Sequence, residues 1–304
     1  MSDLNKTVVA LAAQNQDFVD LAIVTRGNLT ESWHKGLAVL TGPDGKVIAH
    51  KGPAKRLIYP RSAIKPLQTL AMIRAGMKLS GAELAITSAS HRGTDAHLDL
   101  VRAVLKHGDL SEGDLQCPDG IKFNCSGKHS GFLLASKLNG WDTKDYLNPQ
   151  SPIQELVIGV LEEFSGEKIL HTTVDGCGAP LHSMTTEGIA RAIGKLSQTE
   201  TELVDALVEN AWAISNKGVP DAIFLEHGFV AKNGAEGVFV VGTRDGFGIC
   251  IKIADGNLRA APLIAIKLMH ENNLLSKVQY LEMKKLFQVP SLGGGVPQGE
   301  IIAL

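Results

Sequence analysis

A serine and a lysine three positions apart, Ser62 and Lys65, stand in the segment 59–66, YPRSAIKP. Apolar residues follow Pro66 at helical spacing, so we expect a helix with Pro66 in its first turn and Ser62 at or near its N-cap. Ser62 and Lys65 then share one face of that helix. A serine hydroxyl becomes a nucleophile when a base takes its proton, and burial or a second cation gives lysine the lowered pKa that this role needs. A capping serine beside a surface lysine explains the same pattern.

A second group of hydroxyl and imidazole side chains lies in the segment 87–93, TSASHRG, just before a helix that Thr94 opens. Ser90 is a candidate for a second activated hydroxyl or for a donor to substrate, and His91 for the group that orients it. The alternative is a connector between helices that is rich in capping residues.

Two cysteines occur among glycines, in the segments 124–131, NCSGKHSG, and 175–180, DGCGAP. As thiolates, Cys125 and Cys177 have the chemistry to share a zinc ion, with Lys128 or His129 as a third ligand. Two small buried cysteines are the simpler interpretation. Lysine binds metal only as the neutral amine, so Lys128 is an unusual ligand.

A further lysine, Lys252, interrupts the apolar strand predicted over 247–253. Its neighbours Ile251 and Ile253 point to the opposite face, because side chains alternate along a strand. Lys252 therefore either extends its ammonium to solvent or lines a pocket.

Composition limits the classes of function. The chain has 304 residues and a formal net charge of -2, and no block of like charge occurs, so neither nucleic acid nor a membrane surface is an expected partner. The N-terminal residues lack the pattern of a secretory signal, and no apolar run approaches the roughly 18 residues of a membrane span. The four cysteines are unevenly spaced, which favours thiols or metal ligands over disulfides. These features predict a cytoplasmic protein.

The elements that must position these residues are strands near both ends of the sequence and helices between them. Two hairpins are predicted, one over 37–50 and one over 237–253 with Asp245-Gly246 at its turn, and a strand over 17–24. Capping signals predict helices after Ser80, Thr94 and Ser151, the last with Pro152 at its first position and Gly166 past its end. Apolar periodicity predicts further helices over 185–196, 200–214 and 262–271. We expect an α+β fold, an antiparallel sheet built from both chain ends and flanked by helices, in a single domain over 1–304.

Seven segments, taken in order, resemble the L-asparaginase II family, the class 3 group typified by a thermolabile Rhizobium enzyme. They are Arg26-Gly27 with Glu31-Ser32 and His34, Arg61 to Pro66, Ala89-Ser90-His91, Asn124 to His129, Asp175 to Pro180, Lys232 to Gly237, and Lys252 to Asn257. The sequence departs from the family pattern at Arg92-Gly93-Thr94, where relatives often carry a small or polar residue, then glycine, then an acid. Arg92 would add a cation near the pocket.

The resemblance implies a serine β-lactamase-like fold and two Ser–Lys pairs, Ser62 with Lys65 and Ser90 with Lys252. It also implies a metal site, commonly zinc, at Cys125, Lys128 and Cys177, and a homodimer. Arg61 and Asp175 would hold the charged amino-acid end of the substrate L-asparagine, with His91 beside it.

The predicted function is hydrolysis of the side-chain amide of L-asparagine to aspartate and ammonia, with Ser62 as nucleophile and Lys65 as base. One alternative is a glutaminase or another Ser-x-x-Lys acyl hydrolase. Against a penicillin-recognising enzyme, no Lys-Thr-Gly occurs on a strand and Ser90-His91-Arg92 is not Ser-x-Asn. The other alternative is a non-catalytic protein with a structural metal site.

Overall fold

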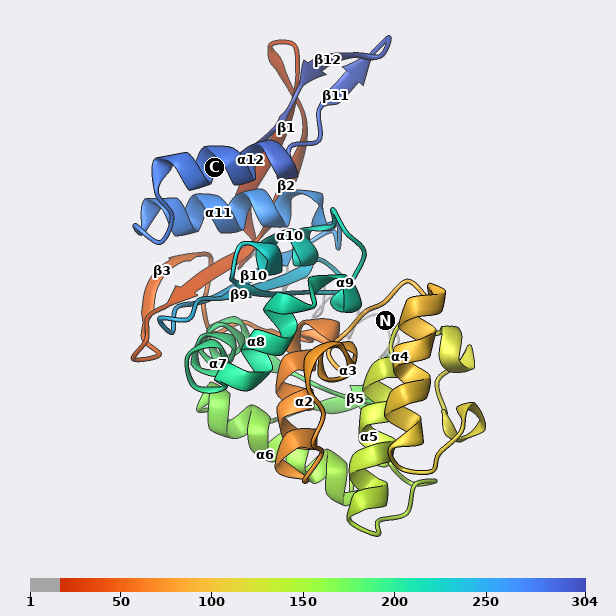
Figure 1. Ribbon diagram of the computed structural model, residues 1–304. Helices are drawn as coiled ribbons and strands as arrows, with labels where there is room; N and C mark the ends of the chain where they lie inside the picture. The colour runs from red at the N-terminus through yellow and green to blue at the C-terminus, as the bar shows by residue number, and fades with distance from the viewer. Residues whose placement is uncertain (1–16) are drawn as a thin grey trace, which may run out of the picture.

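Both ends of the chain form one antiparallel sheet, as expected from the sequence (Figure 1). The computed structural model describes residues 17–304. The sheet has seven strands in the order β13-β1-β2-β10-β9-β8, and β3 pairs with β2 beside this path. Its strands are β1 (Val19–Arg26), β2 (Leu29–Thr41), β3 (Val47–Lys51), β8 (Val230–Gly234), β9 (Val238–Gly242), β10 (Gly248–Ile253) and β13 (Ile301–Ala303).

The helices fall mostly between the two groups of strands. They are α2 (Lys65–Arg74), α3 (Gly81–Ile86), α4 (Asp95–Lys106), α5 (Ser126–Leu138), α6 (Pro152–Ser165), α7 (Thr186–Thr199), α8 (Thr201–Glu209), α9 (Ala211–Ile214), α10 (Pro220–Glu226), α11 (Ala261–Glu271) and α12 (Lys277–Phe287). Three two-stranded sheets complete the described strands: β4 (Leu57–Ile58) with β7 (Met184–Thr185), β5 (Thr172–Val174) with β6 (Pro180–His182), and β11 (Ser291–Gly293) with β12 (Val296–Gly299). No helix in residues 17–304 has both the length and the apolar character of a membrane span.

Alternating side chains divide the core into two parts, one on each face of the sheet. Val39 and Cys250 belong to the core beneath α2 to α9, whereas Leu40 and Ile251, the next residues along their strands, pack toward α11 and α12. Period-2 alternation with both faces covered explains why β9, β10 and the second half of β2 read as nearly continuous apolar runs. The predicted α+β class and the sheet from both chain ends are confirmed. The single domain stays a prediction.

Most predicted elements are present. The structure differs from the prediction mainly in the capping of the helices. Thr94 accepts a hydrogen bond from the His97 backbone N–H and caps α4 as expected. Helix α6 starts at Pro152 and ends at Gly166 in the left-handed conformation, φ 71°. The predicted capping bond of Ser151 is wrong, because its hydroxyl has no partner among the described residues.

Ser62 lies near the N-cap of α2, as expected, but does not occupy it. Residues Arg61–Ile64 form a 3-10 turn, and Ile64 occupies the N-cap of α2, which has a proline in its first turn. Ser62 therefore lies one turn before the α-helix, in a segment whose direction Arg61 sets with a positive φ of 54°. A non-glycine residue with this φ is strained and depends on its surroundings for support.

We predict that Gly248 at the start of β10 tolerates no side chain. A Cβ there would overlap the carbonyl oxygen of Ala190 in α7, so α7 would have to move away from the sheet. Gly248→Ala should lower the free energy of unfolding by about 2 kcal/mol or more, measured by urea denaturation.

The control is Gly159→Ala within α6, where an added Cβ meets no atom within 4 Å. That change should be neutral or stabilise by up to about 1 kcal/mol, because alanine is the better helix former. Equal effects of the two substitutions would contradict the close packing of α7 on β10.

Candidate active site

Ser62 opens onto a cleft of about 440 Å³. The cleft is lined by the 3-10 turn, by the loop of Ser90 and His91, and by the end of β8 at Asn233 and Gly234. Ser62 is half-buried, and its hydroxyl makes no hydrogen bond with any residue in 17–304. It is thus a free hydroxyl at the floor of a solvent-accessible cleft.

Lys65 is buried beneath this floor, with a side chain that is 1% exposed. Its Nζ hydrogen-bonds the carbonyl oxygen of Ala89 and, at 3.1 Å, Ser90 Oγ. Burial lowers the pKa of Lys65 to about 8, and the ammonium groups of Lys232 and Lys128 act in the same direction. A lysine with this pKa is partly neutral near neutral pH, about one molecule in ten at pH 7, and in that form it can act as a base.

The direct partner of Lys65 is Ser90 rather than Ser62. No hydrogen bond joins Lys65 Nζ to Ser62 Oγ among the described residues, although both serines line the same cleft. The arrangement brings Ser62, Lys65 and Ser90 together as a group.

Lys252 does not join this group. Its Nζ donates to the carbonyl oxygen of Glu236, and its side chain lines a neighbouring cavity together with Tyr59 and Arg61. The expected Ser90–Lys252 pair is therefore replaced by a Ser90–Lys65 pair in this structure. Burial lowers the pKa of Lys252 as well.

His91 has both ring nitrogens occupied by the protein. Its Nδ1 accepts from the backbone N–H of Gly93 at 3.0 Å, so Nε2 carries the proton and donates to Ser126 Oγ at 2.8 Å. Burial lowers the pKa of His91 to about 4, with His97 and Lys65 adding to the effect. The ring is neutral, and its place in the structure is to hold the Ser90 loop against α5.

Strand β8 carries Lys232. This lysine lies in one of the segments that resemble the family, but the sequence predicted no role for it. Lys232 is fully buried, and its Nζ contacts Asp221 Oδ2 at 3.1 Å and Asn233 Oδ1 at 2.6 Å. Gly234 follows, and a Cβ there would overlap the carbonyl oxygen of Pro60. In the sequence, the signal for this site is a lysine, a polar residue and a glycine at the end of a strand, with asparagine in place of the threonine of Lys-Thr-Gly.

Arg61 and Asp175 are paired with each other. Arg61 Nε lies 2.6 Å from Asp175 Oδ1, and both side chains are largely buried, with exposed fractions of 25% and 12%. This ion pair holds the 3-10 turn of Ser62 to the loop that carries Cys177. Whether the two residues also bind a substrate stays a prediction.

The predicted metal ligands converge. Lys128 Nζ lies 3.2 Å from Cys177 Sγ. The thiol of Cys125 is hydrogen-bonded to Cys177. This hydrogen bond and the cations of Lys65 and Lys128 lower the pKa of the Cys125 thiol. The other candidate third ligand, His129, instead bonds the hydroxyl of Tyr146 at 2.8 Å. No group of three His, Cys, Asp or Glu side chains in 17–304 is arranged to hold a metal ion, so a site here needs Lys128. The two buried thiols match ligands that zinc prefers. Lys128 fits less well, because the adjacent Cys177 and Cys125 raise the pKa of Lys128 despite its burial, and a lysine binds a metal ion only after losing its proton.

The segment around Cys125 is helical rather than an open loop. Helix α5 begins at Ser126, directly after Cys125, and Gly127 lies where a Cβ would overlap the carbonyl oxygen of Ile86 in α3. The glycines of this segment therefore serve helix packing.

One protein family and several solved structures are similar to this chain. The family model described as L-asparaginase II matches residues 22–303. No curated protein matches the chain significantly. Solved structures with a similar arrangement include a β-lactamase from Mycobacterium bovis, with 14% identity, a TM-score of 0.42 and coverage of 78% of this chain and 94% of that one. Another is a Bacillus glutaminase, with 16% identity, a TM-score of 0.45 and coverage of 79% and 91%.

We predict that His91 makes stability fall in acid. Its folded pKa of about 4 lies below the value of about 6.5 expected in the unfolded chain, so the unfolded state takes up a proton first as pH falls. This contribution is complete above pH 6.5 and is lost between about 6.5 and 4, amounting to about 3 kcal/mol. Urea denaturation across this range should show a smaller pH dependence for His91→Gln than for the wild type.

The control is His107→Gln, at an exposed histidine on the surface. It should keep the pH dependence of the wild type. An unchanged pH dependence in His91→Gln would mean that His91 is not held neutral by burial.

Proposed function

Because the chain belongs to the L-asparaginase II family, it is an amidohydrolase, and we propose that its substrate is L-asparagine. The observation that carries the proposal is the buried Lys65 amine, hydrogen-bonded to Ser90 Oγ under a cleft in which the hydroxyl of Ser62 is free. A hydroxyl beside a lysine of lowered pKa is the arrangement that acyl transfer needs.

The proposed reaction begins with attack of Ser62 Oγ on the side-chain amide carbon of asparagine. Ser90 Oγ accepts the proton from Ser62 and passes its own to neutral Lys65, since Lys65 Nζ contacts Ser90 directly. The proton then goes to the departing ammonia, and water hydrolyses the ester on Ser62 to release aspartate. Lys252 keeps only a supporting role near Arg61.

Backbone N–H groups at the cleft are suited to the oxyanion. The N–H of Asn233 points away from β9, toward Asp221. Ala235 follows β8 directly, in the turn that leads to β9, and it lines the Ser62 cleft. Gly234 allows the turn of Ser62 to pack against this strand. We assign the oxyanion site to the N–H groups of Ser62 and Ala235.

Zinc is proposed at Cys125, Lys128 and Cys177. A bound ion would act as a Lewis acid that positions polar groups of the substrate. Arg61 and Asp175 are proposed to orient the charged end of asparagine, as the ion pair ties the Ser62 turn to the loop of Cys177. The homodimer and the cytoplasmic location stay predictions.

The nucleophile is tested by alanine substitution of each serine. Ser62→Ala should lower ammonia release from asparagine by about 10³-fold or more, because the covalent route is lost. Ser90→Ala should lower kcat but still allow some acyl-enzyme to form, detected by mass spectrometry after quenching. The control is Ser291→Ala on β11, outside the lining of the cleft, which should retain full activity.

Activity of Ser62→Ala within about tenfold of the wild type would refute the assignment. A covalent adduct in Ser62→Ala that disappears in Ser90→Ala would exchange the roles of the two serines.

Glutamine is assayed beside asparagine, because one methylene group alters the discrimination between two substrates by only about 1–3 kcal/mol. A higher kcat/KM for glutamine would make the protein a glutaminase.

Metal binding is tested by elemental analysis of the purified protein. We expect about one zinc per chain, and loss of that zinc in Cys177→Ala and Lys128→Met. Cys117→Ala is the matched control, because Cys117 is buried but bonds the carbonyl oxygen of Gly120 instead. Zinc that persists in Cys177→Ala, or an absence of zinc from the wild type, would contradict the site.

A further inference from the structure

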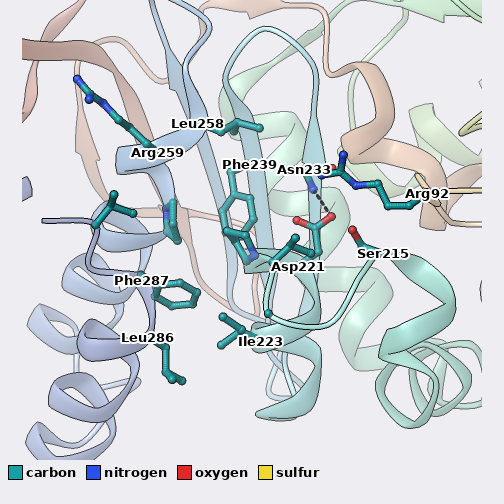
Figure 2. Close-up of a pocket in the computed structure, with 15 residues that line it drawn as sticks. Arg92, Ser215, Asp221, Ile223, Asn233, Phe239, Leu258, Arg259, Leu286 and Phe287 are labelled. Atoms are coloured by element: carbon teal, nitrogen blue, oxygen red, sulfur yellow. Dashed lines mark hydrogen bonds between the residues drawn. The ribbon is translucent and has the colours of Figure 1, made fainter. Parts of the chain in front are cut away.

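A second cavity, of about 320 Å³, adjoins the Ser62 cleft. Figure 2 shows the residues that line this second cavity. The cavity and the cleft share Arg92, Ser215, Asn233 and Leu258 as a common wall. Asparagine would leave this cavity empty, because the amide nitrogen of asparagine carries no further group that could enter it. A cavity that opens from a reaction cleft can admit a part of the substrate that lies beyond the reacting bond.

The floor of the second cavity is apolar. Ile223, Phe239 and Phe287 line it, and all three are almost fully buried. Figure 2 shows Ile223 and Phe287 on the side away from Arg92, with Phe239 between Phe287 and Asn233. Leu286 borders the cavity from α12 and is 55% exposed. Such a floor favours a branched or aromatic hydrocarbon group.

The shared wall carries an arginine without a partner. Arg92 is exposed and forms no hydrogen bond or ion pair with any residue of 17–304. Among the described residues that line the Ser62 cleft there is no aspartate or glutamate, whereas Lys122 adds a second cation. This wall is therefore suited to a carboxylate of the ligand.

The same cavity contains an acceptor that the protein leaves unused. Asp221 is fully buried, and its Oδ2 accepts from Lys232 and from the backbone N–H of Asn233. Its Oδ1 has no hydrogen-bond partner among the described residues and belongs to a side chain that lines the cavity. A buried oxygen of this kind calls for a donor from a ligand or from water.

We propose that this cavity binds the leaving group of β-aspartyl dipeptides whose second residue is apolar, and that the enzyme hydrolyses them. The inference rests on the proposed amidohydrolase reaction at Ser62 and extends it to a substituted amide. Arg92 binds the carboxylate of the second residue, and the floor of Ile223 and Phe239 receives its side chain.

The chemical step balances as it does for asparagine. Ser62 Oγ forms an ester with the side-chain carbonyl carbon, the C–N bond breaks, and the proton that left Ser62 goes to the nitrogen of the leaving amino acid. Water then cleaves the ester. One dipeptide and one water yield aspartate and one apolar amino acid, with no oxidant, reductant or second substrate.

The sharing of four residues favours one continuous substrate site over a separate effector site. A ligand in the apolar cavity would contact Arg92 and Asn233, which also line the cleft of Ser62. An effector bound there would compete with substrate for the common wall.

The test measures kcat/KM of the full chain for β-aspartyl-leucine, β-aspartyl-glycine and asparagine, with amino-acid release followed by chromatography. The α-linked aspartyl-leucine has the same charges and side chain but no side-chain amide, and should not be cleaved. We expect β-aspartyl-leucine to exceed β-aspartyl-glycine by about tenfold, because the leucine side chain leaves water for the apolar floor.

Variants separate the carboxylate contact from the apolar one. Arg92→Ala should lower the ratio of kcat/KM for β-aspartyl-leucine to that for asparagine by about tenfold, and Arg92→Lys should restore part of it. Leu286→Trp, which narrows the cavity from an exposed position, should lower the preference for leucine over glycine. The control is Arg244→Ala, an exposed arginine paired with Asp205 and outside both cavities.

The outcomes distinguish this inference from the proposed function. Turnover of asparagine or glutamine without cleavage of either β-aspartyl dipeptide overturns the leaving-group site alone. No turnover of any amide overturns the proposed function. Cleavage of β-aspartyl-leucine with ratios that Arg92→Ala and Leu286→Trp leave unchanged shows that the dipeptide binds elsewhere, which also overturns this inference.

Discussion

The burial of three lysine amines around one cleft is the constraint on which the site depends. Lys65, Lys128 and Lys232 are each at most 2% exposed, and a buried ammonium is costly unless polar atoms surround it. Lys65 bonds the Ser90 loop, Lys128 contacts Cys177, and Lys232 bonds Asp221. The contacts of Lys65 and Lys128 join segments that are distant in sequence. The amines thus help to organise the site, and with burial they lower the pKa of Lys65.

Small residues allow the backbones around these lysines to approach closely. The turn of Ser62 meets β8 at Gly234, and α5 meets α3 at Gly127; in both places a Cβ would overlap a carbonyl oxygen of the facing segment. The strained φ of Arg61 is supported from the other side by its ion pair with Asp175. Ser62 is thus held by contacts on two sides, which is the rigidity that a preoriented nucleophile needs.

The parts of the fold that could be predicted are those set by local patterns. Asp245-Gly246 predicted the turn between β9 and β10, and Pro152 with Gly166 predicted both ends of α6, because turn and cap geometry depend on a few neighbouring residues. Helix α5 was missed because its first turn, rich in glycine and serine, reads as a loop. What makes it a helix is tertiary packing of Gly127 on α3, which no local pattern contains.

Strand order explains why pairing of site residues was harder to predict than their identity. Lys252 lies on β10, and β9 separates that strand from β8, whose end lines the Ser62 cleft. Since neighbouring strands are about 4.8 Å apart, two strand spacings remove Lys252 from that edge by about 10 Å. Lys65 lies one helical turn after Ser62, so no strand separates it from Ser90. The sequence offers two lysines to the serines, Lys65 and Lys252, and the order of strands in the sheet keeps Lys252 away from them.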